Sequence, residues 1–327
     1  MLQAVSGRQW DLLGLGAVSV DDVYYVNHYP PSNTKIEIQG VSRRGGGLAG
    51  TALVTAARLG ARAAYCGVLG DDELSTFTLK ELESEGVDCT HVERRPDGRP
   101  FHALVIVDSS NGERTILYTG KGVSEPSPDS ITEELIGSCQ VLFIDHTVVA
   151  SSFRALEIAR RVGATVVADL ESRSDPRIEA LQASVDHLIV GVDFARAITG
   201  SADPDEMVRR LSRTNRIVSV VTAGDRGCWW ARSDGESHWH AAFDVDVVDT
   251  IGCGDVFHGA YAARIAVNDT IENAVHVAAA AAALKAASAG RAGTLSWTAV
   301  EAFLRSPPAM RKRESGSQSA ARARPPL

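Results

Sequence analysis

The sequence contains little that would cross-link the chain or insert it into a membrane. Only five of its 327 residues are cysteine, and no two of them form a C-x-x-C pair. An odd number of scattered thiols argues against a disulfide framework or a zinc site and favours a reducing compartment. The N-terminus lacks the plan of a secretory signal, and the most apolar run, residues 277–284, is far shorter than the roughly 18 residues of a membrane span. We therefore expect a cytoplasmic protein with no membrane partner.

The chain also lacks the excess of positive charge that phosphate-backbone binders carry. Its formal net charge is −8, which argues against a nucleic-acid partner. The segment after Met310 has five basic residues and one acidic residue, so a net +4 there leaves −12 on the remainder. Its Ser, Ala, Arg and Pro content is typical of flexible ends, and we predict a disordered basic tail over residues 309–327.

Several catalytic motifs are absent as well. The sequence has no G-x-x-x-x-G-K-[ST], no H-E-x-x-H and no G-x-S-x-G, and its nine histidines show no metal-ligand spacing. At the motif level this excludes P-loop NTPases, H-E-x-x-H metalloproteases and hydrolases with a G-x-S-x-G nucleophile elbow.

The pattern that is present predicts an α/β fold. A buried strand is expected at 10–18, and from residue 131 onward amphipathic helices alternate with short apolar strands, which indicates a three-layer, doubly wound, mostly parallel sheet. A hairpin near 227–243 should finish one sheet edge. We predict a single domain over residues 1–308, with excursions near 22–44 and 98–120 that pair into a small β-sheet lid. Ligands of such sheets lie beyond the carboxyl ends of the strands.

The glycine-rich turn at 45–50, GGGLAG, formally matches G-x-G-x-x-G, with Asp71 and Asp72 about 20 residues further on. A dinucleotide fingerprint belongs in the first strand-to-helix turn, whereas a strand and an exposed β-excursion precede this one. Two other interpretations stay open. Bare glycine backbone would let a polyhydroxylated ligand approach closely, and glycine also suits a tight turn with helix packing.

The stretch DTIGCGDVFHGA, residues 249–260, places glycines and Asp255 at the start of a predicted helix, after a predicted strand at 245–249. Amides around Gly252, Cys253 and Gly254 would form an anion hole at the positive end of the helix dipole. We expect the same dipole to keep Asp255 ionised, as a base for a phosphoryl acceptor or as an ordinary helix cap. A second glycine turn, TAGDRG at 222–227, suits nucleotide phosphates.

These residues together resemble the ribokinase, or PfkB, family of carbohydrate kinases over about residues 10–305. GGGLAGTALVTAARLG is similar to that family's N-terminal signature, and VVDTIGCGDVFHGA is similar to its D-T-x-G-A-G-D signature, with Cys253 at the usual Ala. The resemblance implies a ribokinase-like fold, phosphoryl transfer from ATP to a sugar hydroxyl, Mg²⁺ and a homodimer through the β-lid. A monovalent cation stays open.

The resemblance also implies roles for individual residues. It makes Asp255 the base and Gly252, Cys253 and Gly254 the anion hole. The expected nucleotide contacts are Thr222, Gly224, Gly227 and Asp249. The expected sugar contacts are Asp21, Gly46, Gly47 and Thr51. Apart from the resemblance, Lys35, Arg43 and Arg44 near the lid are candidates for binding a charged group on the substrate, or are solvated lid charges.

Two departures from the family pattern matter. Where the family often has N-x-x-E, supporting Mg²⁺, this chain has Gly191 to Phe194, so metal support is expected from Asp169 or Glu171. Thr51 replaces the Asn of ribokinases proper. Thr51 weakens the case for ribose, and the missing N-x-x-E resembles the ketohexokinase-like and sulfofructose kinase-like branches, as do the stretches VDVVDT and GRAG. A nucleoside kinase and a catalytically impaired sugar or nucleotide sensor remain as alternatives.

Overall fold

Three β-sheets organise residues 7–110, 113–291 and 293–312, the part of the chain that this computed structural model describes. The largest has nine strands in the order β15-β14-β13-β12-β11-β10-β1-β4-β6. Its strands are β1 (Trp10–Leu15), β4 (Ala63–Cys66), β6 (Val87–Asp88), β10 (Cys139–Asp145), β11 (Thr165–Asp169), β12 (His187–Gly191), β13 (Val218–Thr222), β14 (Cys228–Arg232) and β15 (Ser237–His240). All pairs are parallel except the β13–β14–β15 edge, which is antiparallel as predicted.

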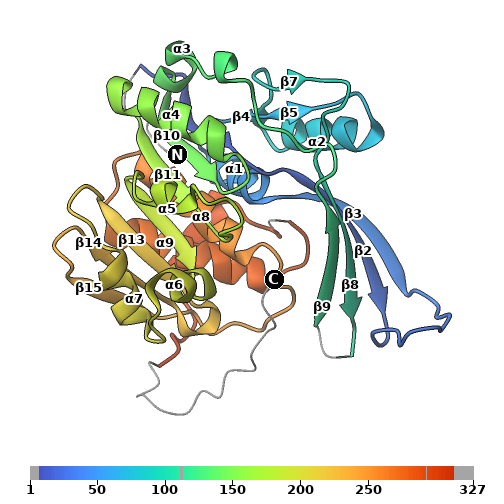
Figure 1. The fold of residues 1–327 in the computed structure, drawn as a ribbon. Coiled ribbons are helices and arrows are strands. Elements are labelled where there is room, and N and C mark those ends of the chain that lie inside the picture. The colour runs from blue at the N-terminus through green and yellow to red at the C-terminus, as the bar shows by residue number, and fades with distance from the viewer. Residues whose placement is uncertain (1–6, 111–112, 292, 313–327) are drawn as a thin grey trace.

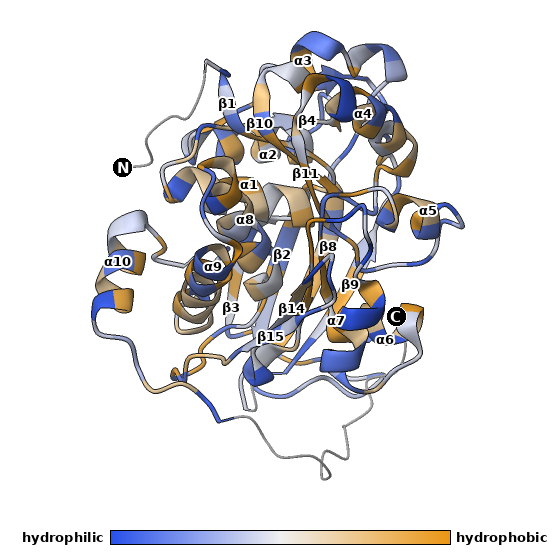
Figure 2. Cartoon of the chain, turned by 90° about the vertical axis from the view of Figure 1, so that its left-hand side faces the viewer, coloured by the Kyte–Doolittle hydropathy of each residue, from blue (hydrophilic) through white to orange (hydrophobic). Residues whose placement is uncertain are grey.

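Helices cover both faces of this sheet and make three layers (Figure 1). The first face packs against α1 (Leu48–Arg58), α2 (Glu73–Ser84), α8 (Cys253–Ala266), α9 (Ile271–Ala286) and α10 (Trp297–Arg305). The second packs against α3 (Glu133–Gly137), α4 (Val149–Val162), α5 (Ile178–Gln182), α6 (Val192–Thr199) and α7 (Pro204–Leu211). Blue and orange alternate along outer helices such as α4 and α7, because each has one exposed and one buried side (Figure 2).

The strand residues alternate between two apolar cores. Leu12 and Phe143 belong to the core under α1, α8 and α9, whereas Leu13 and Leu142 belong to the core under α4 to α7. All four side chains are completely buried. Burial on both faces explains why these strands appear in the sequence as continuous apolar runs rather than alternating ones.

The predicted excursions pair into a separate four-stranded sheet in the order β3-β2-β8-β9. Its strands are β2 (Ser19–Val26), β3 (Gly40–Gly46), β8 (Phe101–Asp108) and β9 (Arg114–Thr119). The central strand β2 is antiparallel to β3 and parallel to β8. Val23, Ala103 and Val105 on one face form a small core with Ile251, so this face is turned toward the main domain.

The remaining described elements are short. A third sheet joins β5 (Val68–Leu69) to β7 (Glu93–Arg94), and single 3₁₀ turns occupy η1 (Pro128–Ser130) and η2 (Gly224–Arg226). Among the described residues, no helix combines the length and the apolar character that a membrane crossing requires.

The predicted strand at 245–249 is wrong. The N–H groups of Val248 and Asp249 both donate to the carbonyl of Ala286 at the end of α9, at 2.7 and 3.1 Å. Val247 and Val248 are exposed. The valines favour extended backbone, but the amides here pair with an unsatisfied carbonyl at a helix end rather than with another strand.

Residues 309–311, the start of the predicted disordered tail, pair with the main domain. Met310 forms a β-bridge with Phe243, and the amides of Asp244 and Arg311 donate at 2.8 Å to the carbonyls of Ala309 and Ala242. The predicted tail therefore begins with residues that pair with the main domain. Residues 313–327 of that predicted tail lie outside the described residues.

Candidate active site

The carboxyl ends of the parallel strands bring polar residues to one edge of the large sheet. Asp145 ends β10 and Asp169 ends β11, and the two are register partners. Gly191 and Thr222 are partners in the same way at the ends of β12 and β13. This edge is where a doubly wound sheet binds its ligands.

Helix α8 begins over this edge without a side-chain cap. Its N-cap is Gly252, whose φ of +76° is the left-handed conformation that glycine adopts without strain. The helices α9 and α10, by contrast, are capped by the hydroxyls of Thr270 and Ser296. The amide of Val256 donates to the Gly252 carbonyl at 2.9 Å, and the Cys253 amide donates over a long 3.4 Å to the Thr250 carbonyl. The other amides of the first turn are left for another acceptor. Asp255 lies inside this turn and is not the cap.

A pocket of about 260 Å³, including its open mouth, lies between this helix start and the small sheet. Its walls come from β2, the turn between β3 and α1, the start of α8, and the segment after α9. The lining residues are Asp21, Arg44, Gly45, Gly46, Gly47, Thr51, Ile251, Gly252, Asp255 and Arg291. The structure thus brings the four predicted sugar contacts other than Lys35 together with the predicted base.

Gly46 leaves room for the sugar-side carboxylate. A Cβ at this position would collide with the Ser19 hydroxyl and the Asp21 carboxylate. The Ser19 hydroxyl donates to Asp21 Oδ1 at 2.8 Å, which fixes the carboxylate beside the glycine turn. The glycine signature therefore has a specific use here: its bare backbone forms one wall against which Asp21 is held.

The surroundings of Asp255 act against the ionised state that the helix dipole predicts. Burial raises the pKa of Asp255 well above its ordinary value, and the carboxylates of Glu171, Asp21 and Asp145 raise it further, while Arg291 opposes them. These effects favour the protonated carboxyl, against the ionised one that the helix dipole alone predicts. Additional positive charge in the pocket would favour ionisation.

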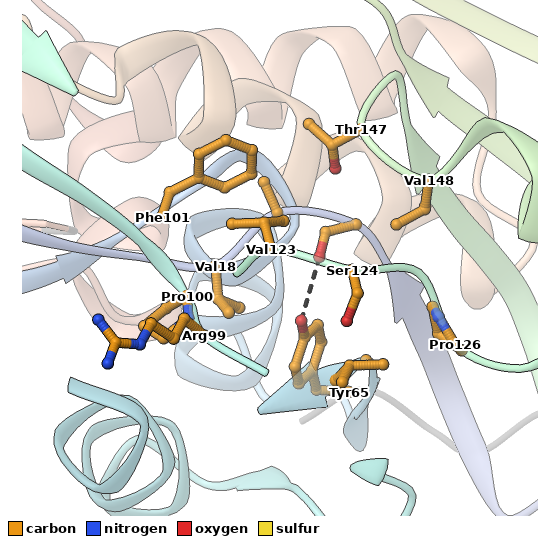
Figure 3. Close-up of a pocket in the computed structure, with 14 residues that line it drawn as sticks. Val18, Tyr65, Arg99, Pro100, Phe101, Val123, Ser124, Pro126, Thr147 and Val148 are labelled. Atoms are coloured by element: carbon orange, nitrogen blue, oxygen red, sulfur yellow. Dashed lines mark hydrogen bonds between the residues drawn. The ribbon is translucent and has the colours of Figure 1, made fainter. Parts of the chain in front are cut away.

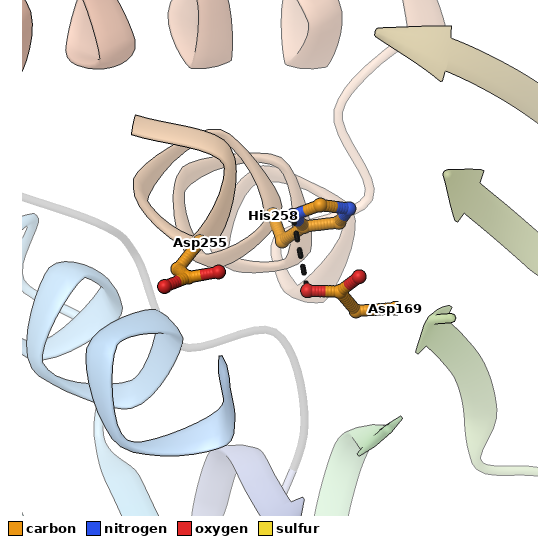
Figure 4. Close-up of side chains that lie close together, drawn as sticks. All are labelled: Asp169, Asp255 and His258. Carbon is orange, nitrogen blue, oxygen red and sulfur yellow. Dashed lines mark ion pairs between the residues drawn. The ribbon is translucent and has the colours of Figure 1, made fainter. Parts of the chain in front are cut away.

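Asp169 lies close to Asp255 and His258, with one possible ligand atom of each within 4.8 Å of the others (Figure 4). Asp169 is completely buried, and neither of its carboxylate oxygens has a hydrogen-bond partner among the described residues. Burial raises its pKa well above the ordinary value, and the nearby carboxylates of Glu171, Asp255 and Asp145 add to this. Unpaired buried oxygens are costly without a cation or a proton.

His258 is a poor candidate for a metal ligand. Its Nδ1 is 2.6 Å from the carbonyl oxygen of Gly254 and 3.3 Å from Asp169 Oδ2. Burial lowers its pKa to about 4, so the ring is neutral near pH 7 and donates its Nδ1 proton to that carbonyl. Mg²⁺ prefers oxygen ligands. Asp169, together with the exposed Glu171, therefore fits a magnesium ion, and His258 does not.

The residues that stand in place of N-x-x-E, Gly191 to Phe194, lie at the end of β12 and the start of α6. A Cβ at Gly191 would meet nothing within 4 Å, so this point at the end of β12 is open. Phe194, at the position of the family's Glu, is buried in the core under α6. The departure therefore replaces a carboxylate with a core residue.

Asp249, a predicted nucleotide contact, is held by groups of the protein. Its Oδ2 is 3.2 Å from both Arg44 Nη1 and Lys285 Nζ, and its Oδ1 accepts from the Ile251 amide at 2.8 Å. Partial burial would raise the pKa of Asp249, but the Ile251 amide and the two cations hold it below its usual value. The Lys285 side chain is completely buried. These contacts anchor the turn that leads into α8.

The other predicted nucleotide contacts lie at the end of β13. The Thr222 hydroxyl donates to the Val190 carbonyl at 3.3 Å. Gly224 is left-handed at φ +59°, and a Cβ there would meet nothing within 4 Å, so its backbone is open. Gly227 is packed against the backbone of β15 and is in close contact with the His240 carbonyl. Gly224 thus presents accessible backbone, whereas Gly227 serves packing.

Lys35 lies in the exposed segment between β2 and β3 and is not among the described residues that line the pocket. A second pocket, of about 290 Å³ including its open mouth, is lined mainly by the segments 16–18, 99–101 and 123–126 (Figure 3). Tyr65 lines it and donates to the Gly16 carbonyl at 3.1 Å. Its described lining contains no carboxylate, so it offers no base for a hydroxyl group.

Sequence reasoning missed two cations at the site. Arg291 lines the pocket, and the ammonium group of Lys285 forms an ion pair with Asp249. Lys285 lies in the last turn of the alanine-rich helix α9, and Arg291 follows that helix. A lysine inside an otherwise apolar run and an arginine between glycines were the available signals.

Comparison with known proteins confirms the resemblance. The model of the pfkB family of carbohydrate kinases matches residues 15–298. A deoxyribokinase from Salmonella typhi is 26% identical over 307 residues, which cover 90% of this chain and 97% of that protein. An ATP-dependent ribose-1-phosphate kinase from Halopiger xanaduensis is 28% identical with the same coverage, 90% and 97%. A solved ribokinase-like structure from Agrobacterium tumefaciens has a TM-score of 0.83 at 27% identity, over 92% of this chain and 98% of the other. The chain belongs to the pfkB family of carbohydrate kinases.

Proposed function

We propose that this chain is an ATP-dependent carbohydrate kinase that transfers the γ-phosphoryl group to a hydroxyl of a sugar. One observation supports this most strongly: Asp21, the glycine turn and Asp255 line a single pocket beside a helix start that no side chain caps. Such a pocket offers an acceptor for sugar hydroxyls, a base and backbone amides at a helix start. The family membership and the ATP-dependent relative support ATP as the donor.

In the proposed reaction the sugar lies between Asp21 and Asp255. The Asp255 carboxylate takes the proton of the attacking hydroxyl as that oxygen bonds to the γ-phosphorus. The bond between this phosphorus and the bridging oxygen breaks, and ADP leaves. Amides at Gly252, Cys253 and Gly254 hold the oxygens of the transferred group where their negative charge gathers.

Thr222 and the open backbone at Gly224 are the groups proposed to contact the nucleotide phosphates. Asp169 and Glu171 are the carboxylates proposed to hold Mg²⁺. Asp169 has two buried oxygens with no hydrogen-bond partner among the described residues, and Glu171 is exposed beside it. When bound, Mg²⁺ would neutralise charge on the phosphates. A monovalent-cation requirement, and the branch of the family to which the chain belongs, stay predictions from the resemblance.

We also propose a cytoplasmic homodimer formed through the outer face of the lid. Leu104 and Leu117 are exposed cross-strand neighbours on this face, and Val41 is exposed on the same side. Leu117→Asp should halve the mass measured by light scattering, since it places a charge in the apolar patch. Lys121→Asp, beyond the end of β9, is the control. An unchanged dimer in Leu117→Asp would contradict this interface.

The activity test is ADP release over a panel of ketoses, aldoses, sulfosugars and nucleosides. Turnover of a sugar supports the proposal, and turnover of nucleosides alone would favour a nucleoside kinase. The replacement of the family's Glu by the buried Phe194 motivates one rival, a sensor without turnover. A compound that raises the melting temperature but is not phosphorylated would favour that rival.

A further inference from the structure

Arg291 reaches the pocket from the segment that follows α9 and contacts a turn 245 positions away in the sequence. Its Nη2 donates to the Gly46 carbonyl at 2.6 Å, and its Nη1 is 2.9 Å from Glu81 Oε2 on α2. Only 6% of its side chain is exposed. The guanidinium therefore joins α2, the glycine turn and the pocket wall at one point.

The glycines around this arginine make space for it. A Cβ at Gly45 would collide with the Glu81 carboxylate and lie 2.7 Å from Arg291 Nη1. A Cβ at Gly50 would lie 2.8 Å from Nη2. Neither contact could form with a larger residue unless the ion pair moved. This part of the glycine signature thus accommodates a guanidinium behind the pocket.

Arg291 also lies next to the second glycine turn. A Cβ at Gly252 would be 3.7 Å from both the Arg291 carbonyl oxygen and Asp255 Oδ2. The guanidinium of Arg291 therefore contacts the turn before α1, and its backbone lies near the turn before α8.

The charge of Arg291 acts on both carboxylates of the pocket. It lowers the pKa of Asp21 and that of Asp255, in each case against the larger effect of burial. An arginine keeps its proton throughout the physiological range, so this positive charge is permanent. Its Nε–H has no hydrogen-bond partner among the described residues.

We propose that Arg291 is a positioning residue of the phosphoryl transfer: it holds the glycine turn at Gly46 in place and supplies a fixed positive charge beside Asp21 and Asp255. This inference rests on the proposed kinase activity. It assigns to a residue outside both signature motifs the task of keeping the sugar-side carboxylate and the base in their working arrangement.

Three variants test the proposal. Arg291→Gln removes the charge and the clamp, and Arg291→Lys keeps the charge but cannot donate to Glu81 and Gly46 with a planar fork. The matched control is Arg58→Gln. Arg58 pairs with Glu85 at 2.7 Å and donates to the Gly293 carbonyl at 2.8 Å, but it is outside the pocket lining. Arg58→Gln removes an ion pair between the end of α1 and Glu85, which follows α2, together with a hydrogen bond to the segment after α9.

Arg291→Gln should lower kcat/KM on the order of 10²-fold, because small displacements of reacting groups cost that much. The acidic limb of its pH profile should shift to higher pH. Arg291→Lys should lower kcat/KM without shifting the acidic limb of the pH profile. Arg58→Gln should change neither kcat/KM nor the pH profile. Equal effects of Arg291→Gln and Arg58→Gln on rate and profile would overturn the proposal, as would wild-type turnover in Arg291→Lys.

A carbon-13 NMR titration of the Asp255 carboxyl separates this inference from the proposed function, because it needs no turnover. The resonance is assigned by its loss in Asp255→Asn. Its pKa should be higher in Arg291→Gln than in the wild type and the Arg58→Gln control. An unchanged pKa would overturn the inference even if sugars are phosphorylated, and a raised pKa would support the electrostatic part even if none is.

Discussion

Replacing Asp255 by Asn tests both the chemistry and the electrostatics of the site. The variant removes the base and keeps the size and most hydrogen bonds of the side chain. Loss of a general base costs roughly 10²- to 10⁴-fold in rate. At 1.36 kcal/mol per factor of ten, this corresponds to about 2.7–5.4 kcal/mol of transition-state stabilisation. Steady-state ADP release with the best substrate of the panel measures it.

The same substitution should make the protein more stable. The folded pKa of Asp255 is raised above its unfolded value, so the unfolded chain loses this proton first as the pH rises. Stability is therefore lost as the pH rises above the unfolded pKa, and it is regained in acid. Asp255→Asn removes that penalty, and its melting temperature at pH 7 should exceed that of the wild type. The difference should shrink toward pH 4.

Lower activity together with a higher melting temperature would exclude misfolding of Asp255→Asn, since a misfolded variant would lose both activity and stability. Asp246→Asn, an exposed neighbour in the preceding loop, is the control and should alter neither quantity. Turnover close to wild type in Asp255→Asn would refute the base assignment. A lower melting temperature at pH 7 would refute the electrostatic reasoning.

Three further predictions concern neighbouring groups. Cys253→Ala should leave ADP release nearly unchanged, because the proposed anion hole uses amides and burial raises the pKa of the Cys253 thiol to about 11; a large loss would reveal a role for the thiol. Asp169→Asn should raise the Mg²⁺ concentration for half-maximal turnover by about tenfold or more, and the exposed Glu179→Gln should not; coincident Mg²⁺ curves for Asp169→Asn and the wild type would contradict the assignment. Burial lowers the pKa of His187 to about 4. Since the unfolded chain then binds the extra proton between about pH 4 and 6.5, His187 destabilises the fold as the pH falls through that window. In urea titrations His187→Gln should reduce the pH slope of the unfolding free energy by up to about 1.4 kcal/mol per unit; parallel slopes would argue against it.

Most of the fold was predictable because its strands are buried on both faces and its helices on one. The alternation after residue 131, the antiparallel edge and the pairing of the two excursions all follow from apolar periodicity and turn residues. The error at 245–249 shows the limit of this reasoning. Valines report a preference for extended backbone, but whether a neighbouring strand is available depends on the tertiary arrangement, and here the Ala286 carbonyl takes the amides instead.

The site was predictable where the sequence carries local constraints and not where contacts are distant. Gly46 and Gly252 lie in glycine patterns that demand a close approach or a left-handed turn, so their positions in the pocket could be anticipated. Arg291 could not, because its partners Glu81 and Gly46 are 210 and 245 positions away. The raised pKa of Asp255 was missed for the same reason, since the burial that mainly raises it and the carboxylates that raise it further both come from other elements.

The carboxylates at the sheet edge explain why a protein would retain such a costly arrangement. Asp145 and Asp169 are adjacent because their strands are in register, and Asp255 is added when α8 begins over them. Burial raises the pKa of all three. With no cation present, the cluster must hold protons or bear repulsion, and either state weakens the fold relative to an apolar edge. A cation bound at Asp169 would relieve that repulsion and would displace protons from the cluster. Under the proposed function, Mg²⁺ held there would therefore favour the ionised form of Asp255, the proposed base.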